Sequence, residues 1–94
     1  MIDGEYIEYY LSGEIKYKCF YLDGKLHGES IYYFKSGDIA SISNYLCGDT
    51  HGECIYYHAS GKIYLKSLYI YSKGVTELEW LSYNRNIKLE LIGL

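Results

Sequence analysis

The side chains best suited to metal binding or catalysis lie in one short run of the chain. Cys47, His51 and Cys54 have the spacing Cys-x3-His-x2-Cys, and His27 lies 24 residues before His51. A structural zinc ion takes four nitrogen or sulfur ligands at the corners of a tetrahedron. Only three such ligands are local here, and their spacing matches no standard zinc motif. The sequence therefore predicts no metal site and no cofactor.

Catalytic pairings are excluded by distance. Cys54 and His58 are four residues apart, which on a strand corresponds to about 13 Å and lies beyond hydrogen-bond reach. Glu5, Glu29 and Glu53 recur at equal spacing, but on successive hairpins their carboxylates would be about 10 Å apart, too far to share a proton. We predict no catalytic residues and a protein that is not an enzyme.

The composition limits the partners that the chain can have. Its 94 residues suffice for a single domain over 1–94. Twelve acidic against nine basic residues give a net charge of -3, which excludes a generic nucleic-acid binder and disfavours anionic membrane lipid. An odd number of cysteines (three) and an acidic start that does not resemble a signal peptide predict a cytoplasmic protein.

The chain repeats itself every 24 residues without gaps, in the blocks 4–27, 28–51 and 52–75. Self-similarity at a fixed period is typical of repeat architectures. Residues 76–94 continue the phase as a degenerate fourth copy, which we expect to cap the array. Eight columns are identical in the three blocks, and the first block contributes to them Gly4, Glu5, Ile7, Tyr9, Ser12, Gly13, Ile15 and Tyr21.

Each block has the pattern of a β-hairpin. Residues 5–10 form a short aromatic and β-branched strand, residues 11–13 a loop with a left-handed glycine, and residues 14–22 the return strand. This loop places Tyr10 opposite Glu14, Tyr9 opposite Ile15 and Ile7 opposite Tyr17. The sequence therefore predicts an all-β fold without helix: an elongated antiparallel meander of tandem β-hairpins, a single twisted sheet of about seven or eight strands.

The predicted register divides the side chains between two faces of one sheet. The first face would carry Ile7, Tyr9, Ile15, Tyr17, Cys19 and Tyr21, their counterparts Ile31, Tyr33, Ile39, Tyr45, Ile55, Tyr57, Ile63, Leu65 and Tyr69, and finally Leu81, Ile87, Leu89 and Leu91. A single layer cannot bury both faces, and exposed aromatic patches usually mark contact surfaces. Unless the sheet curls over itself, we expect a partner to bind the second face, through Tyr6, Tyr32, Tyr56, Tyr64, Phe20, Phe34 and Trp80.

The last strand of this prediction, residues 87–92, would lie at an open sheet edge. Its alternating pattern would either pair with a second copy of the chain in a homodimer or close the core over the third repeat.

The recurring Gly-Glu-x-Ile-x-Tyr and Ser-Gly motifs resemble MORN-type repeats. The closest likeness is to the short bacterial and viral variant with a Tyr-x-x-x-Gly core, as in YwqK-type antitoxin family proteins. Here that core stands at 9–13, 33–37 and 57–61. The resemblance implies a non-enzymatic protein-protein binding module and brings no catalytic residues with it.

Three functions remain open. An immunity or antitoxin protein would bind and mask a toxin, and its acidic balance would speed capture of a basic partner. A phospholipid-associated MORN module would use lysines on one strand face. A structural homodimeric scaffold would cover its faces with a second copy. The lysines of the second reading are Lys16, Lys18, Lys66 and Lys88.

Overall fold

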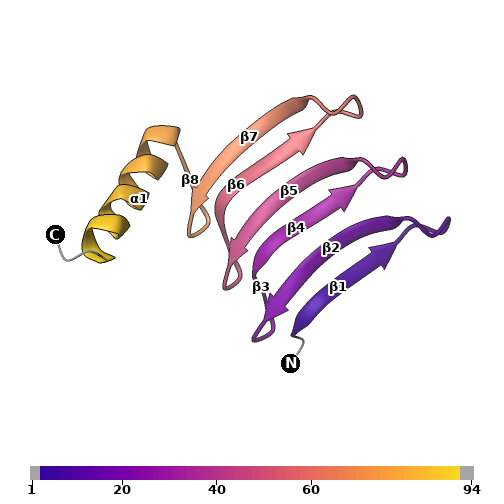
Figure 1. Cartoon of the computed structure of the whole chain (residues 1–94), viewed down its shortest axis with the longest axis horizontal. Helices are drawn as coiled ribbons and strands as arrows, with labels where there is room; N and C mark the ends of the chain where they lie inside the picture. The colour runs from indigo at the N-terminus through magenta and orange to yellow at the C-terminus, as the bar shows by residue number, and fades with distance from the viewer. Residues whose placement is uncertain (1–2, 92–94) are drawn as a thin grey trace.

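The computed structural model describes residues 3–91, and the side chains of residues 3–85, as one open antiparallel sheet followed by one helix (Figure 1). Seven strands lie side by side in chain order, β1-β2-β4-β5-β6-β7-β8, and the short β3 pairs with β2. The predicted single-sheet meander of tandem β-hairpins is confirmed, and the predicted absence of helix is wrong. The elements are β1 (Gly4–Tyr9), β2 (Ile15–Leu22), β3 (Lys25–Leu26), β4 (Gly28–Tyr33), β5 (Ile39–Leu46), β6 (Asp49–Tyr57), β7 (Ile63–Ile70), β8 (Lys73–Val75) and α1 (Glu77–Leu91).

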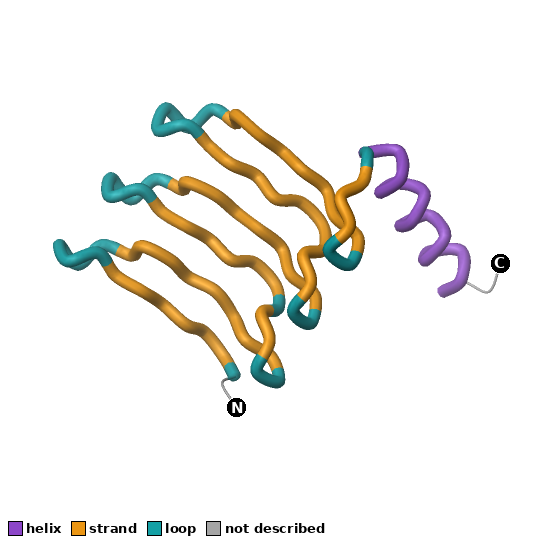
Figure 2. Tube along the Cα trace, turned by 180° about the vertical axis from the view of Figure 1, so that it is seen from behind, coloured by secondary structure: helices purple, strands orange, loops and turns teal. Residues whose placement is uncertain are grey.

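The loops inside the three repeat hairpins have the predicted form. The Tyr10 N–H donates to the Glu14 carbonyl (2.8 Å), and the Gly13 N–H donates to the Tyr10 carbonyl (2.9 Å). Gly13 has a φ of 103°, a conformation that glycine adopts without a steric penalty. The same bonds recur at 34–38 and 58–62. The three loops form a row at one end of the strands (Figure 2).

The turns at the other end of the strands are tighter, and the residue pairs that form them differ between copies. Asp23 and Gly24 have φ values of 51° and 76°, as the two-residue type I′ turn of a hairpin requires. Cys47-Gly48 and Tyr71-Ser72 occupy the same positions, also with positive φ. Only the last copy lacks glycine there, so it carries the most strained turn of the three.

The predicted strand register is correct beside each loop and wrong beyond it. Tyr9 lies opposite Ile15 as expected, but Ile7 lies opposite Lys18 rather than Tyr17. The reason is a one-residue β-bulge at Lys16, which recurs in the pairing of β4 with β5 and of β6 with β7. A bulge adds a residue to one strand only, so every side chain after it changes face.

The bulge separates the tyrosines from the isoleucines. One surface, which we call the tyrosine face, carries Tyr6, Tyr17, Tyr21, Tyr32, Tyr45, Tyr56, Tyr64 and Tyr69. The opposite surface, the isoleucine face, carries Ile7, Tyr9, Ile15, Ile31, Tyr33, Ile39, Ile42, Ile55, Tyr57 and Ile63. The prediction that Tyr17, Cys19, Tyr21, Tyr45, Leu65 and Tyr69 share the isoleucine face is therefore wrong.

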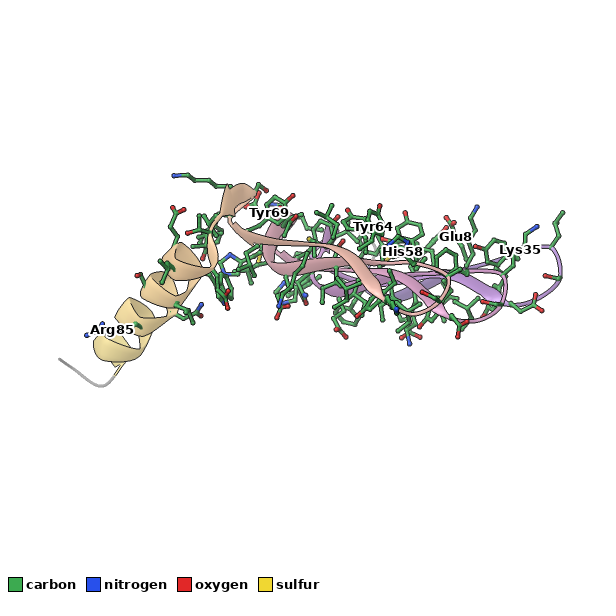
Figure 3. The ribbon with its side chains drawn as sticks, turned by 90° about the horizontal axis from the view of Figure 1, so that it is seen from above. Glu8, Lys35, His58, Tyr64, Tyr69 and Arg85 are labelled. Atoms are coloured by element: carbon green, nitrogen blue, oxygen red, sulfur yellow. The ribbon has the colours of Figure 1, made fainter. Side chains whose placement is uncertain are left out.

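The sheet is a single layer, and neither face is covered by another layer (Figure 3). Its principal dimensions are 53 × 36 × 20 Å. Burial is deepest on the tyrosine face, beneath the rings and near the middle of the sheet. The deeply buried side chains described there are Cys19, Ser30, Ser41 and Cys54.

The prediction of further strands over 76–94 is wrong for residues 77–91, which form α1, and residues 92–94 lie outside the described part. Thr76 and Glu79 form a capping box: the Glu79 N–H donates to the Thr76 hydroxyl oxygen (3.2 Å) and the Thr76 N–H to the Glu79 carboxylate (3.1 Å). Glu77 and Glu79 also place negative charge in the first helical turn, where it is favourable. Of the residues expected to continue the strand face, Ile87, Leu89 and Leu91 lie in this helix, and their side chains lie outside the described part.

Candidate functional site: the tyrosine face

Tyrosine rings contact one another across neighbouring strands of the tyrosine face. Tyr17 of β2 and Tyr32 of β4 have ring centroids 4.3 Å apart at an interplanar angle of 30°. Tyr6 of β1 approaches Tyr17 from the other side at 6.4 Å. On the far half of the sheet, Tyr56 and Tyr64 are 6.1 Å apart. Ring pairs at these separations attract one another beyond the burial of their area, so the rings stabilise each other's positions.

Small polar side chains lie beneath the rings. Ser30 and Ser41 are 4% and 7% exposed, so the tyrosines cover them almost fully. Burial raises the pKa of the Tyr17 phenol, and it also raises the pKa of Tyr45. The pKa of Tyr6 is raised chiefly because its hydroxyl donates to the Glu8 carboxylate (2.7 Å). These phenols therefore stay neutral well into the alkaline range.

The rings that cover this layer remain accessible on their outer side. Tyr6 and Tyr56 are each 37% exposed, Tyr32 is 49% exposed and Tyr64 is 57% exposed. Near the loops, the ring of Tyr10 has the ammonium nitrogens of Lys16 and Lys35 each 5.9 Å from its centroid. The tyrosine face is thus a flat, aromatic surface with hydroxyl groups for hydrogen bonding and a positive group at one end.

The residues predicted to bind a partner divide into two sets. Four of them, Tyr6, Tyr32, Tyr56 and Tyr64, lie together on the tyrosine face, and Phe34 follows β4 at its loop end. Phe20 is opposite Glu5 on the isoleucine face, and Trp80 lies in α1. The prediction that all seven share one surface is wrong. The bulge also brings onto the same face four tyrosines that strict alternation places on the other one, Tyr17, Tyr21, Tyr45 and Tyr69.

Comparison with protein families decides what this array is. The model of the MORN repeat variant matches residues 2–25, 26–46 and 50–71, which is more than half of the chain. The chain belongs to the MORN repeat variant family. Searches of curated proteins and of solved structures found no match. MORN repeats are typically non-catalytic and serve as binding modules.

The lysines of this MORN sheet do not share a face. Lys18 and Lys66 lie on the isoleucine face, opposite Ile7 and Ile55. Lys16 is the bulge residue beside Tyr10, and Lys88 lies in α1. The predicted row of four lysines is therefore wrong, and the lipid-surface hypothesis, which follows from the MORN resemblance, loses the lysine row that was to support it. No helix within residues 3–91 is long and apolar enough to cross a membrane.

The histidines and cysteines of the MORN repeats have structural contacts that differ from a metal site. The Nδ1 atoms of His27 and His51 accept hydrogen bonds from the Cys47 and Tyr71 amides, each at 3.2 Å. Cys54 is buried within the sheet, whereas Cys47 is exposed beside His27. Within the part of the chain that the structure describes, no three His, Cys, Asp or Glu side chains are grouped to hold a metal ion.

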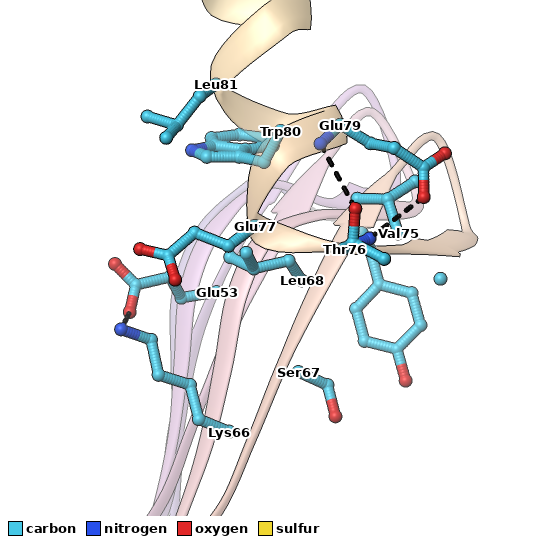
Figure 4. A pocket seen from close by; sticks show the side chains of 12 residues that line it. Glu53, Lys66, Ser67, Leu68, Val75, Thr76, Glu77, Glu79, Trp80 and Leu81 are labelled. Atoms are coloured by element: carbon cyan, nitrogen blue, oxygen red, sulfur yellow. Dashed lines mark hydrogen bonds and ion pairs between the residues drawn. The ribbon is translucent and has the colours of Figure 1, made fainter.

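Where the MORN sheet meets α1, an open cavity of about 790 Å³ lies between the last strands and the start of the helix (Figure 4). Trp80 and Leu68 line it, together with the ion pair of Lys66 and Glu53 (3.0 Å). Both partners of that pair are about half exposed, so its contribution to stability is small. The hydrogen bond to Glu53 is the main reason that the pKa of Lys66 is raised. The lining takes Lys66 and Leu68 from the isoleucine face and Ser67 and Tyr69 from the tyrosine face, so the cavity lies at the end of the sheet.

Proposed function

We propose that this MORN module is a non-enzymatic binding protein whose tyrosine face docks a protein partner. The observation that carries the proposal is the row of exposed rings, from Tyr6 through Tyr32 to Tyr64, on a face that no other element among residues 3–91 covers. Tyrosine is an effective interface anchor because it offers a large contact area with few rotatable bonds. Leaving such rings in water forgoes burial energy that a partner would recover.

The contacts within the row favour a rigid docking surface. Tyr17 and Tyr32 are stacked, and Tyr6 is held by the Glu8 carboxylate as well as by the Tyr17 ring. Rings already fixed in place lose little entropy on binding, so more of the contact energy appears as affinity. A standard protein interface covers about 800 Å² on each partner, and a sheet of this extent can supply that area.

The charge of the chain favours a basic partner, and we propose a toxin that the module masks, as an immunity or antitoxin protein in the cytoplasm. The net charge is -3. Opposite charge accelerates encounter between proteins, which benefits a protein that must capture a harmful partner quickly. The separation of the lysines described above makes an anionic lipid surface a poorer ligand for the same module.

The test is capture of a partner by the purified chain in an extract of its source organism, with variants that separate the faces. Tyr32→Ser and Tyr56→Ser each remove an exposed ring from the tyrosine face. Tyr9→Ser is the matched control, because Tyr9 is 59% exposed but lies on the isoleucine face. We expect one partner to bind the unaltered chain and the Tyr9 variant, with affinity at least about tenfold weaker for the double variant.

The toxin role is tested separately with the partner so identified. Purified partner should be inhibited by equimolar unaltered chain, and deletion of the gene should sensitise the source organism to it. Equal capture by the unaltered chain, the Tyr9→Ser variant and the double variant would contradict the tyrosine face as the binding surface. Capture of a partner that harms no cell would contradict the toxin role while leaving the docking surface in place.

A further inference from the structure

The two edges of the sheet differ in how much of the outer strand is covered by a neighbouring element. β1 stands first in the strand order and pairs only with β2, so its outer side has no neighbour among the described residues. β1 contains no proline, which would have blocked pairing at an edge. At the other end, β8 pairs with Leu68–Ile70 of β7, and α1 shares a cavity with Lys66 and Ser67 of the same strand. Among the described residues, β1 is therefore the edge strand that is open along its whole length, whereas β8 covers part of β7 and leaves residues 63–67 without a strand partner on that side.

The hydrogen-bonding groups at the open edge can be assigned from the loop. The Tyr10 N–H points toward β2, since it donates to the Glu14 carbonyl. Backbone groups alternate in direction along a strand, so those of Glu8 and Tyr6 also point toward β2. The N–H and C=O groups of Glu5, Ile7 and Tyr9 consequently point outward, away from the sheet.

In the second repeat, the strand equivalent to β1 already pairs with another strand through the side that β1 leaves open. Ile31 occupies in β4 the place that Ile7 occupies in β1, 24 residues earlier. Ile31 faces Lys18 of β2 across the boundary between two repeats. The edge that β4 uses to join its neighbour is thus the same edge that β1 leaves open.

We infer that the open edge of β1 pairs with β1 of a second copy of this chain, antiparallel about a two-fold axis at Ile7. In this register Ile7 lies opposite Ile7 of the second copy, and the outward groups of Glu5 and Tyr9 exchange hydrogen bonds with those of Tyr9 and Glu5. Antiparallel pairing of one strand with itself satisfies the symmetry of a closed dimer.

The side chains of β1 select this register over its neighbours. Centring the pair on Glu5 or on Glu8 would place two carboxylates directly opposite each other, which is unfavourable. Centring on Ile7 places each Glu8 opposite a Tyr6 hydroxyl, the partner that Glu8 already has within its own chain (2.7 Å). Centring on Tyr6 would leave Tyr9 without a partner inside β1.

The alternative of a head-to-tail chain of copies fits the structure less well. It would require β1 of one copy to lie against β7 of the next. There residues 63–67 of β7 could accept the approaching strand, but at Leu68–Ile70 it would meet β8 and then α1, including Trp80 beside the cavity. The two-fold pairing requires no displacement. It also makes the tyrosine faces of the two copies continuous, because the axis runs perpendicular to the sheet.

The dimer is tested on the 94-residue chain by sedimentation velocity over a wide range of concentration. We expect a reversible monomer–dimer equilibrium with a limiting mass of twice 10.9 kDa. Ile7→Lys places two like charges opposite each other and should weaken dimerisation about tenfold or more. The matched control is Ile63→Lys, an exposed isoleucine of the same face at the other end of the sheet, which should dimerise as the unaltered chain does.

A second variant and a residue-level measurement guard against misfolding. Ile7→Pro removes an outward N–H without removing a bond to β2, so it should leave the circular-dichroism spectrum unchanged and abolish the dimer. Amide exchange of Glu5, Ile7 and Tyr9 should slow as the concentration rises, and protection at Tyr9 distinguishes centring on Ile7 from centring on Tyr6.

Three outcomes would overturn the inference. They are a monomer at the highest concentration, a dimer that survives Ile7→Lys and Ile7→Pro in folded protein, and growth into assemblies larger than a dimer. None of these bears on capture of a partner by the tyrosine face, so this inference and the proposed function can fail independently.

Discussion

At Tyr71 and Ser72 the chain adopts a turn that its own residues disfavour. Their φ values are 45° and 67°, in the left-handed region where a side chain costs about 1–2 kcal/mol. The equivalent position to Ser72 is glycine in the two preceding turns, Gly24 and Gly48. The strain at Ser72 is therefore specific to the third turn and can be relieved by one substitution.

We expect Ser72→Gly to raise the free energy of unfolding by about 1 kcal/mol, because the left-handed conformation then carries no steric penalty. The hydrogen bond from the Ser72 hydroxyl to Asp49 is exposed, and its loss offsets little. Thermal unfolding should show a rise in Tm of about 4–8 °C. Ser60→Gly is the control, since Ser60 has no positive φ and should lose stability. A lower Tm for Ser72→Gly would contradict the argument.

The linker histidines should contribute to stability through their rings as acceptors. His27 accepts the Cys47 amide and so connects the first repeat to the turn of the second. His27→Phe keeps a ring but removes the acceptor, and we expect a loss of about 1 kcal/mol in urea denaturation. His58→Phe is the matched control, because that exposed ring is in contact with Tyr64 without such a bond, and its effect should be close to zero. Equal effects of the two variants would count against this role.

Among the elements, α1 should have a first turn whose stability depends on pH. Hydrogen bonds from the Thr76 N–H and hydroxyl lower the pKa of Glu79 below its ordinary value. A carboxyl whose folded pKa is lowered stabilises the fold above its unfolded pKa and loses that contribution as the pH falls through the folded value. The capping box is therefore complete near neutral pH and lost in acid.

We expect the helical circular-dichroism signal and the Trp80 fluorescence to change together as the pH falls below the ordinary pKa of a glutamate and through the lowered pKa of Glu79, before the sheet signal changes. Thr76→Ala should reduce the helical signal at neutral pH, since loss of such a cap costs about 0.5–2 kcal/mol. Glu77→Gln leaves the capping box intact and should keep the acid transition. A transition that persists in Glu79→Gln would show that another group causes it.

The hairpins could be predicted from the sequence because their signals are local. Repeated glycines gave the loops, and apolar residues beside each loop gave the pairing of Tyr9 with Ile15. The bulge at Lys16 left no comparable signal, since its column holds Lys16, Ala40 and Tyr64, which share no chemistry. One uncounted residue then moved Tyr17 and all later side chains of the strand to the wrong face.

The helix was missed for a different reason. A period of 24 carried past residue 75 predicts strand positions for the apolar residues of 76–94, whereas Thr76-x-x-Glu79 is a capping-box signature and indicates a helix. The candidate site could be predicted in part: the exposed aromatic surface followed from the excess of tyrosine over the area a single layer can cover. The bulge decides which tyrosines lie on that surface, so strict alternation along the strands could not identify them.

The whole molecule is a one-dimensional array, in which each hairpin contacts only its neighbours. In such arrays stability is close to a sum of repeat terms and nearest-neighbour interfaces. The interior strands have a partner on both sides, whereas β1 has a partner on one side. Ser30, Ser41 and Cys54, which are among the most buried side chains, belong to the interior strands β4, β5 and β6.

This difference between interior and edge strands predicts the order of amide exchange in the native protein. At concentrations low enough to keep the chain monomeric, amides of β4, β5 and β6 should exchange most slowly, and those of β1 should exchange fastest among the long strands. Ile55→Ala in β6 should speed exchange across the whole sheet, because it weakens the interfaces on both sides of its hairpin. Ile15→Ala in β2 should act mainly on the first hairpin. Identical protection of β1 and β5 would instead mean that the sheet opens only as a single cooperative unit, despite having no second layer to couple its ends.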